Sequence, residues 1–517
     1  MPSTLNAPGI YLEELPSGVH PITGVSTSDT AFVDWFPRGP VSTPTRITSF
    51  TEFTRVFGGL HAQSAASYAV LQYFQQGGAV AWVVRLADAG DTAAAMDIKD
   101  GASPAKKSLA VTAANPGAWG SNLQVAVTTS GSTFSIFVRE VVSGRVVDAE
   151  VFRNLVRTPG AANSAIDVVN AGSRLIRLAA GVGTAGDPAG GAATATGEPD
   201  DTASPSPWAP MSTAGADTTA LATNLGTKLD TAMKTLVSIE PFVFNLLCIP
   251  AMATLGAADQ KALVAGAVTF CAAHQALLLV DPPATTTTPA AAQGLIGTAF
   301  DPSKDAACYY PRLLMPDPLA PGLMRNIGPS GVVAGIMART DGTRGVWKAP
   351  AGIDAVVAGV SLAVPVTEAD SGALNPLGIN AFRSLPVIGN VVWGARTLFG
   401  ADTRASEWKY VPVRRTALYL EQSLRAGLTW VVFEPNDEPL WSQVRLNVGA
   451  FMQDLFRKGA FQGTTPREAY FVRCDRTTTT QSDVDRGVVN ILVGFAPLKP
   501  AEFVVIQIQQ LAGQATA

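Results

Sequence analysis

Charged side chains are scarce in this sequence of 517 residues. Asp, Glu, Lys and Arg together make up 15% of the chain, and the formal net charge is −4. A chain with so little charge and a slight acidic excess has no basic field to attract phosphate backbones or anionic lipids. The composition therefore argues against a protein that binds nucleic acid.

Cysteine and histidine are also rare, with four and three copies. The cysteines are widely spaced and lie mostly in apolar runs, at Cys248, Cys271, Cys308 and Cys474. This pattern predicts reduced core thiols of a cytosolic product rather than disulfides. His274 follows Cys271 by three residues, but no second pair supplies the remaining ligands of a zinc site. We expect neither a metal nor a cofactor.

Long apolar runs are missing as well. None is long enough to cross a bilayer, so we expect no transmembrane helix and no direct membrane insertion. The opening residues MPSTLNAPGIYLEE contain neither a basic segment nor an apolar core. They do not resemble a secretory signal.

Catalytic motifs are few. There is no G-x-S-x-G, and the paired glycines Gly58-Gly59 and Gly77-Gly78 lack phosphate-loop spacing, so they are interpreted as helix ends. Asp281 follows an apolar strand, where a catalytic carboxylate or metal ligand can lie, and Asp341 and Lys348 are conceivable companions. A soluble α/β enzyme or ligand-binding protein therefore remains the alternative function.

The elements that are present predict a multidomain chain of α/β and α+β class. The length exceeds what one core usually holds. Apolar strands alternate with helical patterns, which favours parallel crossover units. The clearest elements are strands at 30–35, 79–86, 242–249 and 276–280 and helices at 67–76, 225–236, 259–274 and 329–337. A strand at 307–315 is expected at a sheet edge because it contains Pro311.

Residues 101–222 have a different character. Strands are predicted at 123–128, 133–138 and 150–155, which indicates a β-rich insertion. From about residue 186 to 219 the chain is mainly Ala, Gly, Thr, Pro and Ser. Only Trp208 and Met211 are large and apolar there, so we expect a flexible excursion without a core.

The C-terminal stretch is the most informative part. Helices are predicted from Arg414 to Gly427 and from Leu440 to Phe456. The run TWVVF (Thr429–Phe433) predicts a buried strand because its residues are β-branched and aromatic. Further strands are expected at 469–474 and 488–493.

Both ends of the chain are predicted to be extended arms. Each carries one short apolar strand beside prolines, with too few apolar residues for a core, so each is expected to pair with the edge of another sheet. The candidate subunit-interaction residues of the arms are Ile10, Tyr11, Leu12, Glu13, Glu14, Phe503, Val504, Val505, Ile506, Gln507 and Ile508.

Several segments resemble the sheath proteins of contractile phage tails and related injection systems. The resemblance covers most of the chain outside the insertion, and it is most specific in the C-terminal region. The segments that carry it include PGIYLEELPSG (8–18), RGPVSTPTRITSFTEFTRVFGG (38–59), VPVRR (411–415), WVVFEPNDEPLW (430–441), GAFQGTTPREAYFV (459–472) and LKPAEFVVI (498–506).

The resemblance implies a structural subunit rather than an enzyme. It implies stacked hexameric rings around an inner tube protein, with baseplate and terminator or cap proteins at the ends, and contraction that drives the tube through a target envelope. Assembly would occur in the bacterial cytoplasm, giving either a phage virion or a phage tail-like injection particle, which the sequence does not distinguish. The expected parts are an N-terminal arm (1–21), a sheath core (22–100), an outer β-rich insertion (101–222), an α/β sheath domain (223–400), a C-terminal sheath domain (401–500) and a C-terminal arm (501–517).

Overall fold

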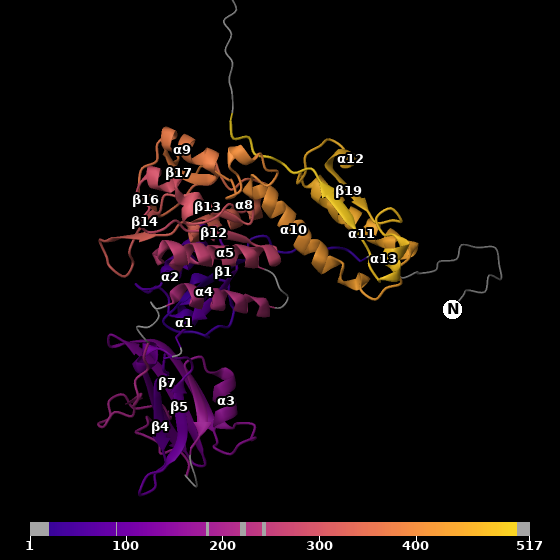
Figure 1. Cartoon of the computed structure of the whole chain (residues 1–517). Coiled ribbons are helices and arrows are strands. Elements are labelled where there is room, and N and C mark those ends of the chain that lie inside the picture. Colours follow the sequence, from indigo (N-terminus) through magenta and orange to yellow (C-terminus); the bar gives the residue numbers. More distant parts are fainter. Residues whose placement is uncertain (1–19, 89, 182–185, 218–223, 240–243, 504–517) are drawn as a thin grey trace, which may run out of the picture. The chain divides into compact units, whose positions relative to one another are not determined.

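The computed structural model describes residues 20–88, 90–181, 186–217, 224–239 and 244–503 (Figure 1). The chain divides into two compact units. The larger unit consists of Ser28–Thr343 and Pro350–Val411. The smaller unit gathers the described residues of Met1–Thr27, Arg344–Ala349 and Pro412–Ala517. The predicted mixed α/β and α+β multidomain class is confirmed, whereas the predicted domain limits stay predictions.

The larger unit is built on an eight-stranded sheet with the order β18-β17-β13-β12-β11-β1-β3-β2. The six inner strands run parallel to one another, and the two edge strands, β18 and β2, are antiparallel to their neighbours. The strands are β1 (Thr30–Trp35), β2 (Thr45–Ile47), β3 (Ala81–Leu86), β11 (Leu246–Cys248), β12 (Leu277–Val280), β13 (Ala306–Tyr310), β17 (Ile379–Leu385) and β18 (Gly389–Val392).

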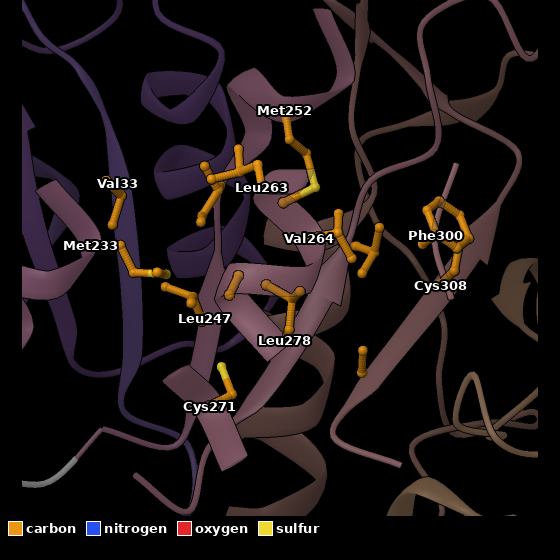
Figure 2. Packing of buried hydrophobic residues seen from close by; sticks show 14 of the residues in the cluster. Val33, Met233, Leu247, Met252, Leu263, Val264, Cys271, Leu278, Phe300 and Cys308 are labelled. Carbon is orange, nitrogen blue, oxygen red and sulfur yellow. The ribbon is translucent and has the colours of Figure 1, made fainter. Parts of the chain in front are cut away.

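Helices cover both faces of this sheet, as a parallel sheet requires. Alternate residues of β1 show the two faces: Val33 belongs to the apolar cluster with α4 and α5, and Phe32 packs edge-on against Tyr73 of α2. Figure 2 shows the first cluster, in which Met233 of α4 and Leu263 of α5 lie with residues of the strands. The helices are α1 (Phe50–Phe57), α2 (Ala65–Gln76), α4 (Leu225–Lys234), α5 (Ala257–Ala273), α6 (Pro289–Gln293), α7 (Leu295–Thr298), α8 (Ser330–Arg344) and α9 (Glu368–Leu374).

Helix α8 approaches α2 through glycines. A Cβ placed on Gly331 would lie 2.7 Å from the Cα and the carbonyl carbon of Ala69, and one on Gly335 would lie 2.6 Å from the carbonyl oxygen of Tyr73. Real Cβ atoms do not come so close to backbone. The two helices therefore pack at a distance that only glycine permits at these positions.

The β-rich part of the larger unit contains two sheets, β10-β6-β7-β8 and β4-β5-β9, which share one apolar cluster. Its elements are β4 (Ala95–Lys99), β5 (Lys107–Ala113), β6 (Leu123–Ser130), β7 (Thr133–Val142), β8 (Arg145–Leu155), α3 (Ala165–Gly172), β9 (Ile176–Ala180) and β10 (Ala209–Pro210). The three predicted strands are confirmed, and β4, β5, β9 and β10 were missed.

The described residues 186–217 are not a free excursion. They contact the sheet through β10, which pairs with β6, through Met211 in the shared apolar cluster, and through polar and aromatic groups. Trp208 stacks at 3.8 Å on the guanidinium of Arg139, which also forms an ion pair with Asp201 at 3.2 Å. The segment has no core of its own, as predicted, but the expected excursion is wrong: Trp208 and Asp201 bind Arg139 of β7, Glu198 pairs with Arg153 of β8, and Met211 lies in the shared apolar cluster.

Two further predictions need correction. Thr429–Phe433 is not a buried strand, because Thr429–Val431 forms a 3-10 helix that continues the end of α10. The side chain of Thr429 donates to backbone carbonyls of the preceding turn. The expected edge strand 307–315 is two strands: β13 lies inside the large sheet, and after Pro311 the chain enters a second sheet with the order β15-β14-β16. The strands of that sheet are β14 (Leu313–Pro316), β15 (Met324–Ile327) and β16 (Ser361–Leu362).

The smaller unit contains two long helices and a two-stranded sheet. The predicted helices are confirmed, and the strand expected at 488–493 begins only at Leu492. The elements are α10 (Val411–Gly427), α11 (Glu438–Arg457), α12 (Pro466–Ala469), β19 (Tyr470–Arg473), α13 (Gln481–Asp485) and β20 (Leu492–Phe495). Among the described residues, no helix combines the length and apolarity needed to cross a membrane.

We expect Gly331→Ala to lower the free energy of unfolding by about 1–3 kcal/mol, because the added methyl group overpacks the contact with α2. Gly342→Ala in the same helix is the matched control, since a Cβ there meets no atom within 4 Å. The control should instead gain about 0.5–1 kcal/mol from better helix propensity. Denaturant unfolding of both variants measures the difference, and equal midpoints would contradict the close approach.

Candidate assembly interface

The candidate assembly interface is the two-stranded sheet of β19 and β20, and helix α11 belongs to the apolar cluster on which one face of that sheet packs. Asp437 caps its N-terminus by accepting a hydrogen bond from the first turn, and Pro439 occupies that turn. The indole of Trp441 donates to Asn436 at 2.9 Å, and Asn436 donates to the carbonyl of Val488 at 3.0 Å. The EPNDEP run therefore both starts α11 and fixes the segment that leads to β20.

Residues 20–27 lie along α10 within the same unit. The ring of His20 stacks on Trp430 at 4.3 Å, and the backbone N–H of Val25 donates to the hydroxyl of Ser423 at 3.2 Å. The described end of the N-terminal arm, at His20, therefore lies beside Trp430, close to the C-terminal end of α10.

The strands β19 and β20 form a two-stranded antiparallel sheet. Within the described part of the chain, no other strand pairs with either of its outer edges. The backbone N–H of Ala496 donates to the carbonyl of Ala469 at 2.8 Å, so these two residues form a hydrogen-bonded pair. Hydrogen-bonded and non-hydrogen-bonded pairs alternate along the strands from there. By this alternation the backbone groups of Tyr470 and Val472 point to the free edge of β19, and those of Val493 and Phe495 point to the free edge of β20.

The two faces of this small sheet differ. Tyr470, Val472, Val493 and Phe495 are half-buried and pack against the apolar cluster that includes α11. The other face carries Phe471, whose ring lies over Gly494: a Cβ on this glycine would be 2.5 Å from Cζ of the ring. Glycine is therefore required opposite the aromatic ring.

The outward face also carries an unpaired cation. Arg473 is exposed, and its guanidinium lies 5.4 Å from the centre of the Phe471 ring. No carboxylate in the described ranges forms an ion pair with it. Phe471 and Leu492 are 46% and 49% exposed. This face thus presents one aromatic ring, one aliphatic side chain and one free positive charge.

The predicted arm residues fall mostly outside the described residues. This applies to Ile10–Glu14 and to Val504–Ile508, so the structure does not bring these candidates together. Phe503 is described; it lies in no strand and is 74% exposed. The open edges of β19 and β20 were not predicted as binding sites, because the sequence does not show which strand edges stay unpaired.

A second exposed apolar feature follows α10. Val432 and Phe433 are 62% and 102% exposed, and Phe433 adopts a left-handed φ of +73°, which is strained for an aromatic residue. The β-branched and aromatic composition suggested burial here. After the 3-10 helix, Val432 and Phe433 instead form an exposed loop.

The carboxylate considered for catalysis is a helix cap. Asp281 is fully buried and accepts hydrogen bonds from the backbone N–H and the hydroxyl of Ser330, at 2.8 and 2.7 Å, at the start of α8. Burial raises its pKa above the ordinary value. Asp341 lies eleven residues along the same helix, about 16 Å away, and Lys348 belongs to the other unit. These residues do not form a catalytic group.

Asp34 has the same role at the end of β1. One of its oxygens accepts from the backbone N–H of Ala66 in α2 at 2.7 Å, and the other accepts from the N–H of Trp35 at 2.8 Å. Burial raises the pKa of this carboxyl to about 7. Two buried acids at strand ends thus cap the two helices that pack against each other.

Comparison with known proteins agrees with this architecture. Residues 403–510 match the phage tail sheath C-terminal domain. The tail sheath protein of Vibrio phage KVP40 is 28% identical over 179 residues, which are 34% of this chain and 25% of that protein. That of Enterobacteria phage T4 is 27% identical over 156 residues, 30% of this chain and 22% of that protein. The matched segments thus span a quarter or less of these relatives.

Solved sheath structures share the fold over nearly the whole chain. The sheath complex of an extracellular contractile injection system, PVC, in its contracted state covers 99% of both chains, with a TM-score of 0.59 and 21% identity. The anti-feeding prophage baseplate, symmetrised six-fold, covers 98% of this chain and 99% of its own, with a TM-score of 0.56 and 23% identity. The sheath tail protein of Listeria innocua covers 92% and 96%, with a TM-score of 0.60 and 14% identity. The C-terminal domain is therefore similar in sequence to that of phage tail sheath proteins, and nearly the whole chain shares the fold of solved contractile sheath proteins.

The buried carboxyl of Asp34 generates a prediction about pH. Its pKa is about 7 in the folded chain against an ordinary 3.8, so the folded state holds the proton more tightly. The stability from this group is complete below about pH 4 and is lost as the pH rises through 7. The loss is at most about 4 kcal/mol.

Asp34→Asn removes this titration. Denaturant unfolding at several pH values should show wild type losing stability relative to the variant between pH 4 and 7. A difference between the two proteins that does not change over this range would contradict the raised pKa.

Proposed function

We propose that this chain is the structural subunit of a contractile sheath. It polymerises as stacked hexameric rings around an inner tube protein, between a baseplate and a terminator or cap protein, and contracts to drive the tube through a target envelope. The particle assembles in the bacterial cytoplasm and is a phage tail or a phage tail-like injection particle. The family membership of the C-terminal domain and the relatives described as contracted sheath and six-fold baseplate support this function.

The observation that carries the proposal is the pair of open edges on the β19–β20 sheet. Unpaired backbone groups at a sheet edge are a template for a strand of another chain. Both arms have the composition of such strands, with residues 10–14 at one end and 503–508 at the other. Each subunit would therefore accept one arm at each edge and donate its own arms to neighbours.

The C-terminal arm suits the edge of β20. Its alternate residues Val504, Ile506 and Ile508 are all apolar, so one face of the added strand would continue the buried face of the sheet. Residues 503–517 contain no charge, and neither does β20. A neutral strand thereby extends a neutral edge.

Energetics favour a lattice over isolated pairs. Each net hydrogen bond adds about 0.5–1.5 kcal/mol, and each buried aliphatic side chain adds about 1.5–3 kcal/mol. Ordering each residue costs about 1–2 kcal/mol, which offsets much of this gain. One arm alone therefore binds weakly, while many arms in a closed lattice bind cooperatively because each bound arm raises the effective concentration of the next.

The role is structural rather than catalytic. The acids at strand ends, Asp34 and Asp281, are buried and occupied in capping helices. They leave no exposed carboxylate for a substrate at those positions. Their role in capping helices explains where these two carboxylates lie, without any catalytic function.

Paired substitutions in the C-terminal arm test the assembly. The chain is co-expressed with its tube partner, and negative-stain electron microscopy counts striated tubes. Ile506→Asp should abolish tubes, because it places a charge on the buried face of the added strand. Gln507→Asp, one position further, points to the other face and should leave tubes intact.

Both variants should remain soluble and folded, because each changes a single residue of a terminal segment. Wild-type tubes should shorten and widen under mild denaturant. Equal tube formation by the two variants, or a wild type that stays a monodisperse monomer, would refute the proposed function.

A further inference from the structure

We propose that Arg38 and Arg85 are positioning residues, which hold the β-rich part of the larger unit, residues 92–217, in one orientation on the part that contains the large sheet. Without their contacts, the β-rich part would turn about its connection to the rest of the unit. This inference concerns the chain itself and does not depend on the proposed assembly.

The covalent connection between the two parts is narrow. The chain enters the β-rich part after β3 and leaves it before α4. There Thr92 and Ala216 lie side by side and exchange two backbone hydrogen bonds, of 3.0 and 3.1 Å. Among the described residues, the apolar cluster of the β-rich part shares no member with the cluster of α4, α5 and the large sheet. Parts with separate cores move relative to one another by default, so a fixed orientation requires further contacts.

Arg85 provides the first of these contacts. It lies near the end of β3 and is fully buried. Its guanidinium donates to the carbonyls of Phe36 and Gly39, at 2.8 and 2.9 Å, in the loop after β1. It also donates to the carbonyl of Pro116 in the β-rich part, at 2.9 Å. Arginine carries five donors in a planar fork, so one side chain binds both parts at once.

Gly117 shows how closely the two parts meet at Arg85. A Cβ on this glycine would lie 2.9 Å from the carbonyl oxygen of Pro37 and 3.1 Å from a guanidinium nitrogen of Arg85. Its φ of +129° is also a backbone conformation that other residues rarely adopt. The turn of the β-rich part therefore lies directly against the loop after β1, with no room for a side chain between them.

Arg38 provides the second contact. It forms an ion pair at 2.5 Å with Glu140 of β7, and both side chains are buried. It also donates to the carbonyls of Thr54 and Arg55, at 3.2 and 2.7 Å, near the end of α1. Its guanidinium lies 5.7 Å from the ring centre of Trp119, a member of the β-rich cluster. Arg38 thus joins a helix beside the large sheet to a strand of the β-rich part.

Two contacts at different places prevent a rotation that one contact would allow. Arg85 binds the turn at Pro116, and Arg38 binds β7 at Glu140. Both arginines are buried, so turning the β-rich part away would leave their charges without partners and out of water. Uncompensated buried charges are strongly destabilising. The orientation seen in the structure is therefore the one in which both guanidinium groups keep their partners.

Distances between spin labels measure this orientation. One label is attached at Ala149→Cys in β8 and the other at Ala262→Cys in α5, both at exposed positions. The four native cysteines are buried, which limits labelling elsewhere. The labelled chain is diluted with unlabelled chain, so that double electron–electron resonance records distances within one molecule. The chain with both arginine contacts intact should give a narrow distance distribution.

Glu140→Gln removes the negative charge that Arg38 binds, and it does so from the β-rich side. The width of the distance distribution should at least double. Glu198→Gln is the matched control, because Glu198 pairs with Arg153 inside the β-rich part, at 2.6 Å. This control should leave the width unchanged.

Gly117→Ala tests the contact at Arg85 without removing the arginine. The added methyl group pushes the turn away from the loop after β1, so the distribution should broaden as well. Gly131→Ala is the control, because Gly131 also has a positive φ, of +60°, but a Cβ there meets no atom within 4 Å. The width should stay the same in this control.

A second label pair separates a change of orientation from local unfolding. Ser130→Cys with Ala149→Cys reports on the β-rich part alone and should keep its narrow distribution in every variant. Equal widths in the two junction variants and their controls would overturn the inference. It would also be wrong if Glu140→Gln broadened the second pair as much as the first, because Glu140 would then support the fold of the β-rich part rather than its orientation.

Discussion

Backbone N–H and C=O groups need hydrogen-bond partners, and in the described part of the chain the sheet of β19 and β20 leaves such groups without a partner strand along both edges. One face of that sheet is packed on α11, so the strands cannot turn their edges away. A strand from a neighbouring subunit would form hydrogen bonds with these groups without any change in the fold. The proposed lattice depends on this constraint.

The large sheet of the larger unit differs from the β19–β20 sheet because its edges are short or covered. Its edge strand β2 has only three residues, and β18 is met by a bridge between Val356 and Val391. Short or covered edges discourage pairing with other chains. The same chain thus contains a large sheet that is protected at its edges and a small sheet that is open. This difference would confine strand exchange to the C-terminal domain, while glycine-mediated packing of α2 and α8 keeps the larger unit compact.

Local chemistry made part of the fold predictable. The strand Thr30–Trp35 was predicted correctly, because an apolar run acts through near neighbours. Thr429–Phe433 was wrong, since a strand forms only where a partner strand exists, and sequence composition does not report that. Likewise, the sequence suggested the arms as interaction residues, but which residues of β19 keep unpaired backbone groups, here Tyr470 and Val472, depends on which edge the ladder leaves open.

The central claim is that neighbouring subunits complete the β19–β20 sheet. Cryo-electron microscopy of the sheath assembled on its tube tests it most directly, because strands at this sheet can be traced to their chains. The account predicts a four-stranded sheet with the N-terminal arm of one neighbour along β19 and the C-terminal arm of another along β20. A sheet that stays two-stranded in the assembled sheath, or is completed only by its own chain, would contradict it.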